Sequence, residues 1–135
     1  TALSVTFIIK QALNMEFSDK QLAAALKVGH AMVEADGVID PNEIEILFGG
    51  LADKISSDRE ELSRMADAMD SVEMIALLSN LTEGQKMYIA GYLASIMISD
   101  SDINEMEMRL WRLISNLCDF PRVSVREAVD FWSKE

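Results

Sequence analysis

The sequence is poor in the residues that build secreted and fibrous proteins. Its single cysteine, Cys118, cannot form an internal disulfide, which excludes a disulfide scaffold and favours a reducing compartment. Two prolines and six glycines among 135 residues exclude a collagen-like repeat. No apolar run approaches the ~20 residues needed to span a bilayer, and no basic-then-apolar segment opens the chain. These absences predict a cytoplasmic protein without direct membrane insertion.

Basic residues are scarce as well. Twelve Lys and Arg stand against 23 Asp and Glu, which gives a formal net charge of −11. Because affinity for phosphates depends on clustered Lys and Arg, we predict no nucleic-acid partner. Dissolved cations or basic proteins are the expected partners of so acidic a chain. Half of the residues are apolar, so length and composition predict one globular domain over residues 1–135.

Signals for helix N-termini recur along the chain. A capping box pairs an oxygen-bearing side chain at the N-cap with Glu or Gln three residues later. Seven pairs fit this pattern: Ser18/Gln21, Asp40/Glu43, Ser57/Glu60, Asp70/Glu73, Thr82/Gln85, Asn104/Glu107 and Ser124/Glu127. With one more helix at the start, they predict helices over residues 2–14, 19–35, 41–54, 58–69, 71–79, 83–99, 105–118 and 125–133. No sustained period-two alternation indicates a strand. We therefore predict an all-α fold, a compact bundle of seven to eight helices.

Two segments are apolar nearly all round, residues 22–33 and 87–98. A helix that is apolar on every side is buried. Both segments contain small residues, including Gly29 and Gly91, that allow helix axes to approach closely. We predict that these two helices form the central pair and that the others wrap around them.

The sequence partly matches itself when it is shifted by 64 residues. Ser18-x-x-Gln21 matches Thr82-x-x-Gln85, and Asp36-x-x-Ile39-Asp40-x-x-Glu43 matches Asp100-x-x-Ile103-Asn104-x-x-Glu107. The pattern predicts an internally duplicated helix-turn-helix unit, about residues 18–54 and 82–118. Two such units would pack about a pseudo-two-fold axis, which would bring the two turns near one another.

Acidic residues at these turns divide into two kinds. Asp40 and Asn104 are predicted N-caps, and Glu43 and Glu107 are their capping partners, so capping alone explains them. Asp36 and Asp100 instead close the last turn of an apolar helix, where a carboxylate is unfavourable by ~0.3–1 kcal/mol. The same placement in both copies predicts a compensating positive charge.

A divalent cation would supply that charge, because few basic residues are near. Lys27 and Arg109 are the closest in sequence. Each turn offers several hard oxygen ligands of the kind that Ca²⁺ or Mg²⁺ prefers: Asp36, Asp40 and Glu43 in the first, and Asp100, Asp102 and Glu107 in the second. No His or Cys joins them, which argues against zinc. A standard EF-hand is rejected because its first acidic ligand would be Met32 or Ile96.

The doubled turn resembles a known family. Glu34-Ala35-Asp36-Gly37-Val38-Ile39-Asp40-Pro41-Asn42-Glu43 and Ser99-Asp100-Ser101-Asp102-Ile103-Asn104-Glu105-Met106-Glu107 resemble the TerB-like family of tellurite-resistance proteins, over about residues 18–120. The resemblance implies a compact all-α domain of about seven helices, a cytoplasmic location and a role in bacterial stress responses. It also implies divalent-cation binding by acidic turn residues, which here are Asp36, Asp40, Glu43, Asp100 and Glu107. Asn104, neutral where the first copy has Asp40, departs from the pattern.

Tellurite itself is an anion, which a chain of net charge −11 repels, and the sequence reveals no basic pocket. We therefore expect any role against tellurite to be indirect, through metal sensing or through other stress-response proteins at the membrane.

The alternative function is a metal-free protein-interaction module. The end helices carry Trp111, Phe131 and Trp132, which would form either a docking patch or part of the core. An enzyme is not predicted. His30 lies in the middle of a helix as a satisfied or partly buried side chain, and Cys118 is expected to be a packed thiol. No nucleophile elbow or phosphate-binding loop is present.

Overall fold

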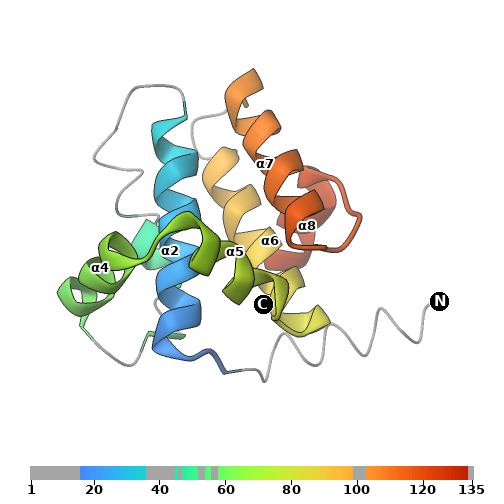
Figure 1. Cartoon of the computed structure of the whole chain (residues 1–135). Helices are drawn as coiled ribbons and strands as arrows, with labels where there is room; N and C mark the ends of the chain where they lie inside the picture. Colours follow the sequence, from blue (N-terminus) through green and yellow to red (C-terminus); the bar gives the residue numbers. More distant parts are fainter. Residues whose placement is uncertain are drawn as a thin grey trace.

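Helices begin at side-chain caps in the computed structural model (Figure 1), which describes residues 16–35, 45, 47–51, 54–55, 58–98 and 103–133. Six helices have defined bounds: α2 (Asp19–Glu34), α4 (Arg59–Ala68), α5 (Ser71–Ser79), α6 (Glu83–Met97), α7 (Glu105–Leu117) and α8 (Val125–Ser133). Each lies within two residues of its predicted range, and the described residues contain no strand. The all-α prediction is therefore confirmed. The helix predicted over 2–14 lies outside the described residues, and that over 41–54 is described only in part.

Four predicted capping boxes are present with both of their hydrogen bonds: Ser18/Gln21, Thr82/Gln85, Asn104/Glu107 and Ser124/Glu127. Asp70 accepts the backbone N–H of Glu73 at 2.8 Å. The pair Ser57/Glu60 was wrong by one residue, because Asp58 caps α4 and accepts the N–H of Glu61 at 2.8 Å. A carboxylate is the stronger partner for the positive end of a helix. The pair Asp40/Glu43 lies outside the described residues.

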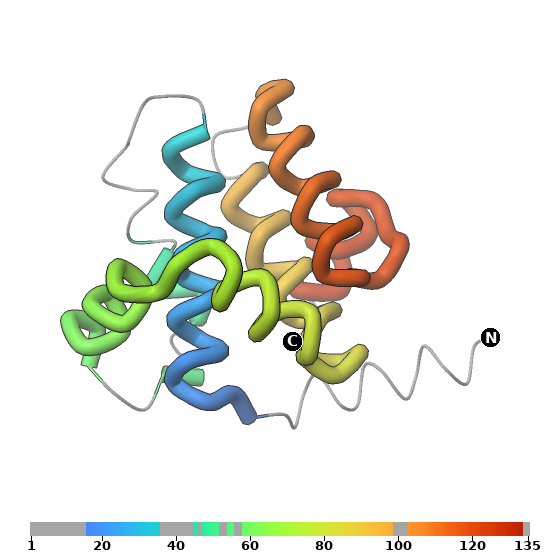
Figure 2. The backbone as a smooth tube through the Cα atoms, in the orientation of Figure 1, coloured from blue at the N-terminus to red at the C-terminus, as the bar shows by residue number. Residues whose placement is uncertain are grey.

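The two apolar helices form the central pair, as predicted. α2 and α6 run side by side in the same direction (Figures 1 and 2), and most of their side chains are buried. Near their starts, Gln85 Nε2 donates to the carbonyl oxygen of Glu16 at 2.8 Å. The last residue of the second apolar segment, Ile98, is the exception, because it ends α6 at the surface.

Gly29 allows the close approach of α2 to α6. A Cβ at this position would lie 2.7 Å from Tyr92 Oη and 2.8 Å from Leu47 Cδ2. The Tyr92 hydroxyl in turn donates to the carbonyl oxygen of Leu47 at 2.8 Å. Burial raises the pKa of Tyr92 well above its usual range, so the ring stays a neutral donor. One side chain thus joins α6 to the helical residues 47–49, across the groove that Gly29 leaves open.

The remaining helices cover this pair. α4 and α5 pack against α2, and α8 packs against α6. On α8, the Trp132 ring lies 4.8 Å from the Tyr88 ring and 6.1 Å from the Tyr92 ring, measured between centroids. Trp111 on α7 is buried. Both tryptophans therefore pack against the core, and an aromatic docking patch on the end helices is not what the structure shows.

α7 ends in a tight reversal of the chain. Asp119 has φ of 54°, and the N–H of Phe120 donates to the carbonyl oxygen of Ser115 at 3.0 Å, the long-range bond of a Schellman motif. Cys118, the C-cap, is fully buried with Sγ 3.9 Å from the carbonyl oxygen of Ile75. Burial raises the pKa of its thiol, and the packed thiol that the sequence predicted is confirmed. None of the described helices is long and apolar enough to cross a membrane.

Candidate functional site

Three described helix ends lie on one side of the helix bundle. α2 and α6 both end there, and α7 begins there (Figure 1). Four of the five predicted ligands, Asp36, Asp40, Glu43 and Asp100, lie outside the described residues, as does Asp102. The described helix ends that flank them are Ala35 and Ile98.

Glu107 is the predicted ligand that the structure places. It is the third residue of α7, and only 5% of its surface is exposed. Its Oε1 accepts the backbone N–H of Asn104 at 3.3 Å, while its own N–H donates to Asn104 Oδ1 at 2.8 Å. The capping function of Glu107 is thus observed, and its binding of a cation stays a prediction.

Basic side chains near this end are engaged elsewhere. The last turns of α2 and α6 contain no Lys or Arg. Lys27 Nζ donates to the carbonyl oxygen of Ala66 at 3.1 Å, at the C-terminal end of α4. Arg109 Nη2 donates to Glu105 Oε1 at 2.8 Å. The two basic residues closest in sequence to the acidic turns thus bond to Ala66 and Glu105 in the described part of the chain.

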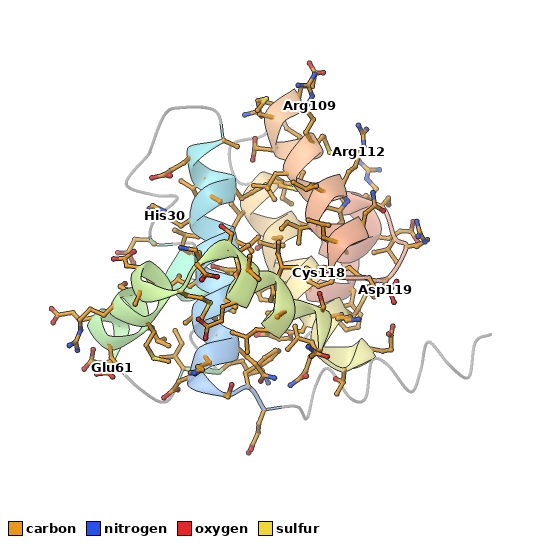
Figure 3. The ribbon with its side chains drawn as sticks, viewed as in Figure 1. His30, Glu61, Arg109, Arg112, Cys118 and Asp119 are labelled. Carbon is orange, nitrogen blue, oxygen red and sulfur yellow. The ribbon has the colours of Figure 1, made fainter. Side chains whose placement is uncertain are left out.

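The described part of the chain shows no metal-ligating cluster. It contains no group of three or more His, Cys, Asp and Glu residues that could hold a metal ion. His30 lies on the solvent-facing strip of α2 with 54% of its side chain exposed, and its Nε2 is 3.6 Å from Glu34 Oε1 (Figure 3). The strip arises because Lys27, His30 and Glu34 recur at helical spacing on an otherwise apolar helix. His30 borders a cavity of about 280 Å³ between α2 and α4, floored by Leu26 and Phe48 among others.

A second cavity, of about 260 Å³, was missed from the sequence. It lies between the C-terminal half of α7 and the chain that follows, and it is bordered by Arg112 and Arg122 over Trp111 and Phe120. The structure thus contains a cavity with a basic border that the sequence alone did not reveal. Arg112 and Arg122 are ten residues apart, and only the reversal at Asp119 turns the second towards the first. The sequence offered only a weak signal, namely that Arg112 follows Trp111 and Arg122 lies two residues after Phe120.

Comparison with known proteins identifies a related structure, but it does not indicate a function. The fold defines a class, compact all-helical domains built on a parallel pair of buried helices. No protein-family model and no curated protein matches the sequence. The crystal structure of PG1108, a protein of unknown function from Porphyromonas gingivalis W83, is similar to this chain with a TM-score of 0.76 and 37% sequence identity. The match covers 88% of this chain and 92% of that one. The chain belongs to the same family as PG1108.

Proposed function

We propose that this chain is a non-enzymatic, cytoplasmic domain of the tellurite-resistance type that binds a divalent cation of the Ca²⁺ or Mg²⁺ class. The ligands would come from Asp36, Asp40, Glu43, Asp100 and Glu107. In a bacterial stress response the domain would act through metal sensing or through partner proteins at the membrane. The resemblance of the doubled turn to TerB-like proteins supports this proposal.

The observation that carries the proposal is the parallel course of α2 and α6. Helices that run in the same direction present their C-terminal carbonyl ends, with their partial negative charge, on the same side of the molecule. In the sequence, the acidic segment 36–43 comes after α2, and the acidic segment 100–107 comes after α6. Lys27 and Arg109, the basic residues closest in sequence to the acidic turns, bond to Ala66 and Glu105, which favours a dissolved cation as the compensating charge.

The variant Asp36→Asn tests whether Asp36 is a cation ligand. We expect this variant to be as stable as the parent without metal, or more stable by ~0.3–1 kcal/mol, because it removes a carboxylate from the negative end of α2. We also expect it to lose the stabilisation by metal, which for a site at 100-fold excess over Kd is about 2.7 kcal/mol. Urea denaturation with Ca²⁺, Mg²⁺, Mn²⁺ or chelator measures both effects.

Asp40→Ala is the contrasting variant, because Asp40 is a predicted N-cap as well as a predicted ligand. Unlike Asp36→Asn, it should lose ~1 kcal/mol of stability even without metal. Failure of every cation to bind below millimolar concentration in calorimetric titration would show that the cation proposal is wrong.

A metal-free interaction module remains the alternative, and one surface favours it. Met106, Leu113 and Leu117 on α7 are 52%, 53% and 49% exposed. With the partly buried Leu110 they follow the 4-3-4 spacing of a coiled-coil seam, so they share one face of the helix. We call these four residues the α7 stripe. A helix that presents such a stripe to solvent is suited to pair with another amphipathic helix.

Leu113→Glu tests the stripe in the purified chain, where a second copy is the available partner. The variant should unfold within ~0.5 kcal/mol of the parent, because Leu113 is half exposed. We expect the parent to associate with rising concentration in sedimentation velocity, and the variant to stay monomeric. Val72→Glu on α5, also at an exposed apolar residue, should leave association unchanged. A parent chain that stays monomeric throughout would exclude self-pairing by the stripe.

A further inference from the structure

The cavity beside α7 combines an aromatic floor with a basic rim. Trp111 and Phe120 are buried beneath it, and the exposed residues Arg112 and Arg122 border it. Ser115 and Asn116 add a hydroxyl and an amide to the same wall. Figure 3 shows Arg112 projecting from α7 towards solvent. The cavity therefore offers apolar contact at its base and hydrogen-bond donors at its mouth.

Local structure fixes the position of Arg122. The reversal at Asp119 brings Phe120 back beneath α7, where its N–H bonds to Ser115. Pro121 follows, and its carbonyl oxygen accepts the N–H of Val123 at 2.9 Å, which closes a three-residue turn with Arg122 at its apex. Arg122 is thus carried by a constrained turn that starts on the cavity floor.

The arginines of this cavity lack acidic partners in a chain with nearly two acids for each base. Elsewhere Lys20, Arg59, Arg64 and Arg109 each form an ion pair with a Glu. Neither Arg112 nor Arg122 has an ion pair or side-chain hydrogen bond with any residue in the described ranges. Arg126 on α8 also lacks such a pair, but it does not border the cavity. Two guanidinium groups at one cavity thus keep their donors available.

The net charge of −11 is unevenly distributed along the sequence. Residues 1–102 contain 17 acidic and 7 basic residues, whereas residues 103–133 contain 5 and 4. Of those five acids, Glu105 is paired with Arg109 and Glu107 is buried in its capping box. At physiological ionic strength charges more than about 8 Å apart are largely screened. The segment that forms the cavity is therefore nearly neutral, and Arg112 and Arg122 are the charged residues that line the cavity.

We propose that this cavity is a binding site for a small organic oxyanion, a phosphate or carboxylate group attached to an apolar ring or chain. Arg112 and Arg122 hold the oxyanion through charge-assisted hydrogen bonds, for which the planar guanidinium is well shaped. The apolar part lies against Trp111 and Phe120. The volume of about 260 Å³ suits a small ligand. The site is independent of the cation proposal, because it shares no residue with the acidic turns.

Calorimetric titration of the purified chain tests the proposal with phenyl phosphate, benzoate and inorganic phosphate. We expect phenyl phosphate to bind with a Kd below about 1 mM, and more tightly than singly charged benzoate. Inorganic phosphate, without an apolar part, should bind more weakly than phenyl phosphate. Because Trp111 forms part of the floor, its fluorescence should change on binding. The ratio of the Kd values of phenyl phosphate and benzoate shows whether the site prefers a phosphate or a carboxylate group.

Arg112→Gln and Arg122→Gln should each weaken phenyl phosphate binding about tenfold or more. Arg126→Gln is the matched control, since it removes an unpaired arginine from the same part of the chain but not from the cavity. It should leave the Kd within about twofold. All three side chains are exposed, so circular dichroism should show a folded protein in each case.

Three results would overturn the proposal. The first is that none of the three anions binds below about 10 mM. The second is that Arg126→Gln weakens binding as much as Arg112→Gln, which would indicate non-specific attraction. The third is equal affinity for inorganic and phenyl phosphate, which would exclude the aromatic floor from the site.

Discussion

Gly29→Val is expected to lower the free energy of unfolding by about 3 kcal/mol. The new side chain would enter space held by Tyr92 Oη and Leu47 Cδ2, which lie 2.7 and 2.8 Å from the position of a Cβ. Both residues are fully buried, so neither can move into solvent. Overpacking a core costs ~1–3 kcal/mol, and loss of the Tyr92–Leu47 hydrogen bond leaves a buried carbonyl unsatisfied at ~1–3 kcal/mol.

Gly49→Val provides the comparison, because a Cβ there would have no atom within 4 Å. We expect its unfolding free energy to stay within ~0.5 kcal/mol of the parent in urea denaturation. Gly29→Ala should lower the free energy of unfolding less than Gly29→Val does. The loss should be smaller still in a Tyr92→Phe background, because that background lacks the nearest oxygen. Equal stability of the two valine variants would mean that α2 and α6 do not depend on a glycine at their contact.

Trp132→Ala is expected to lower the free energy of unfolding by about 3 kcal/mol, near the lower end of the range for buried aromatic residues. The indole packs against the Tyr88 and Tyr92 rings and against the backbone position of Gly91, where a Cβ would lie 3.0 Å from Trp132 Cβ. Truncation would therefore open the contact between α6 and α8. Urea denaturation followed by circular dichroism measures the loss.

Phe131→Ala controls for removal of an aromatic ring from the same helix. Phe131 is partly exposed and lies outside the hydrophobic cluster of the described residues. Its truncation should cost less than about 1 kcal/mol. If Trp132→Ala were as mild as Phe131→Ala, Trp132 would be a surface residue and the aromatic docking patch would return as a hypothesis.

Helix positions were predictable because capping is local. The side chain and the backbone N–H that it accepts are three residues apart, so Thr82 and Gln85 reveal the start of α6 without any tertiary information. The one error has the same origin. Ser57 and Asp58 both fit the pattern with a Glu three residues on, and the charged oxygen of Asp58 forms the cap.

Burial of the central pair was predictable for a related reason. A helix that is apolar all round has no face for solvent, whatever its neighbours are. The sequence could not show which residues would fill the contact between α2 and α6. That Gly29 faces Tyr92, and that Tyr92 bonds to Leu47, depends on residues 45 to 63 positions apart.

The two candidate sites also differ in whether the sequence could reveal them. Acidic turn residues were found because they repeat in sequence, and Glu107 was correctly assigned to its cap. The cavity of Arg112 and Arg122 was missed, since neither arginine stands out in a chain of twelve basic residues. Its basic character arises only when the chain reverses at Asp119 and brings Arg122 to the cavity that Arg112 also borders.

By itself, then, the amino-acid sequence determined the all-α class, the helix starts and the identity of the buried pair, because caps and apolar periodicity act over a few residues. Tertiary structure alone decided that α2 and α6 run in the same direction, that Trp111 and Trp132 pack inward, and that two arginines share one cavity. These features depend on contacts between residues distant in sequence, whose geometry no short-range pattern encodes.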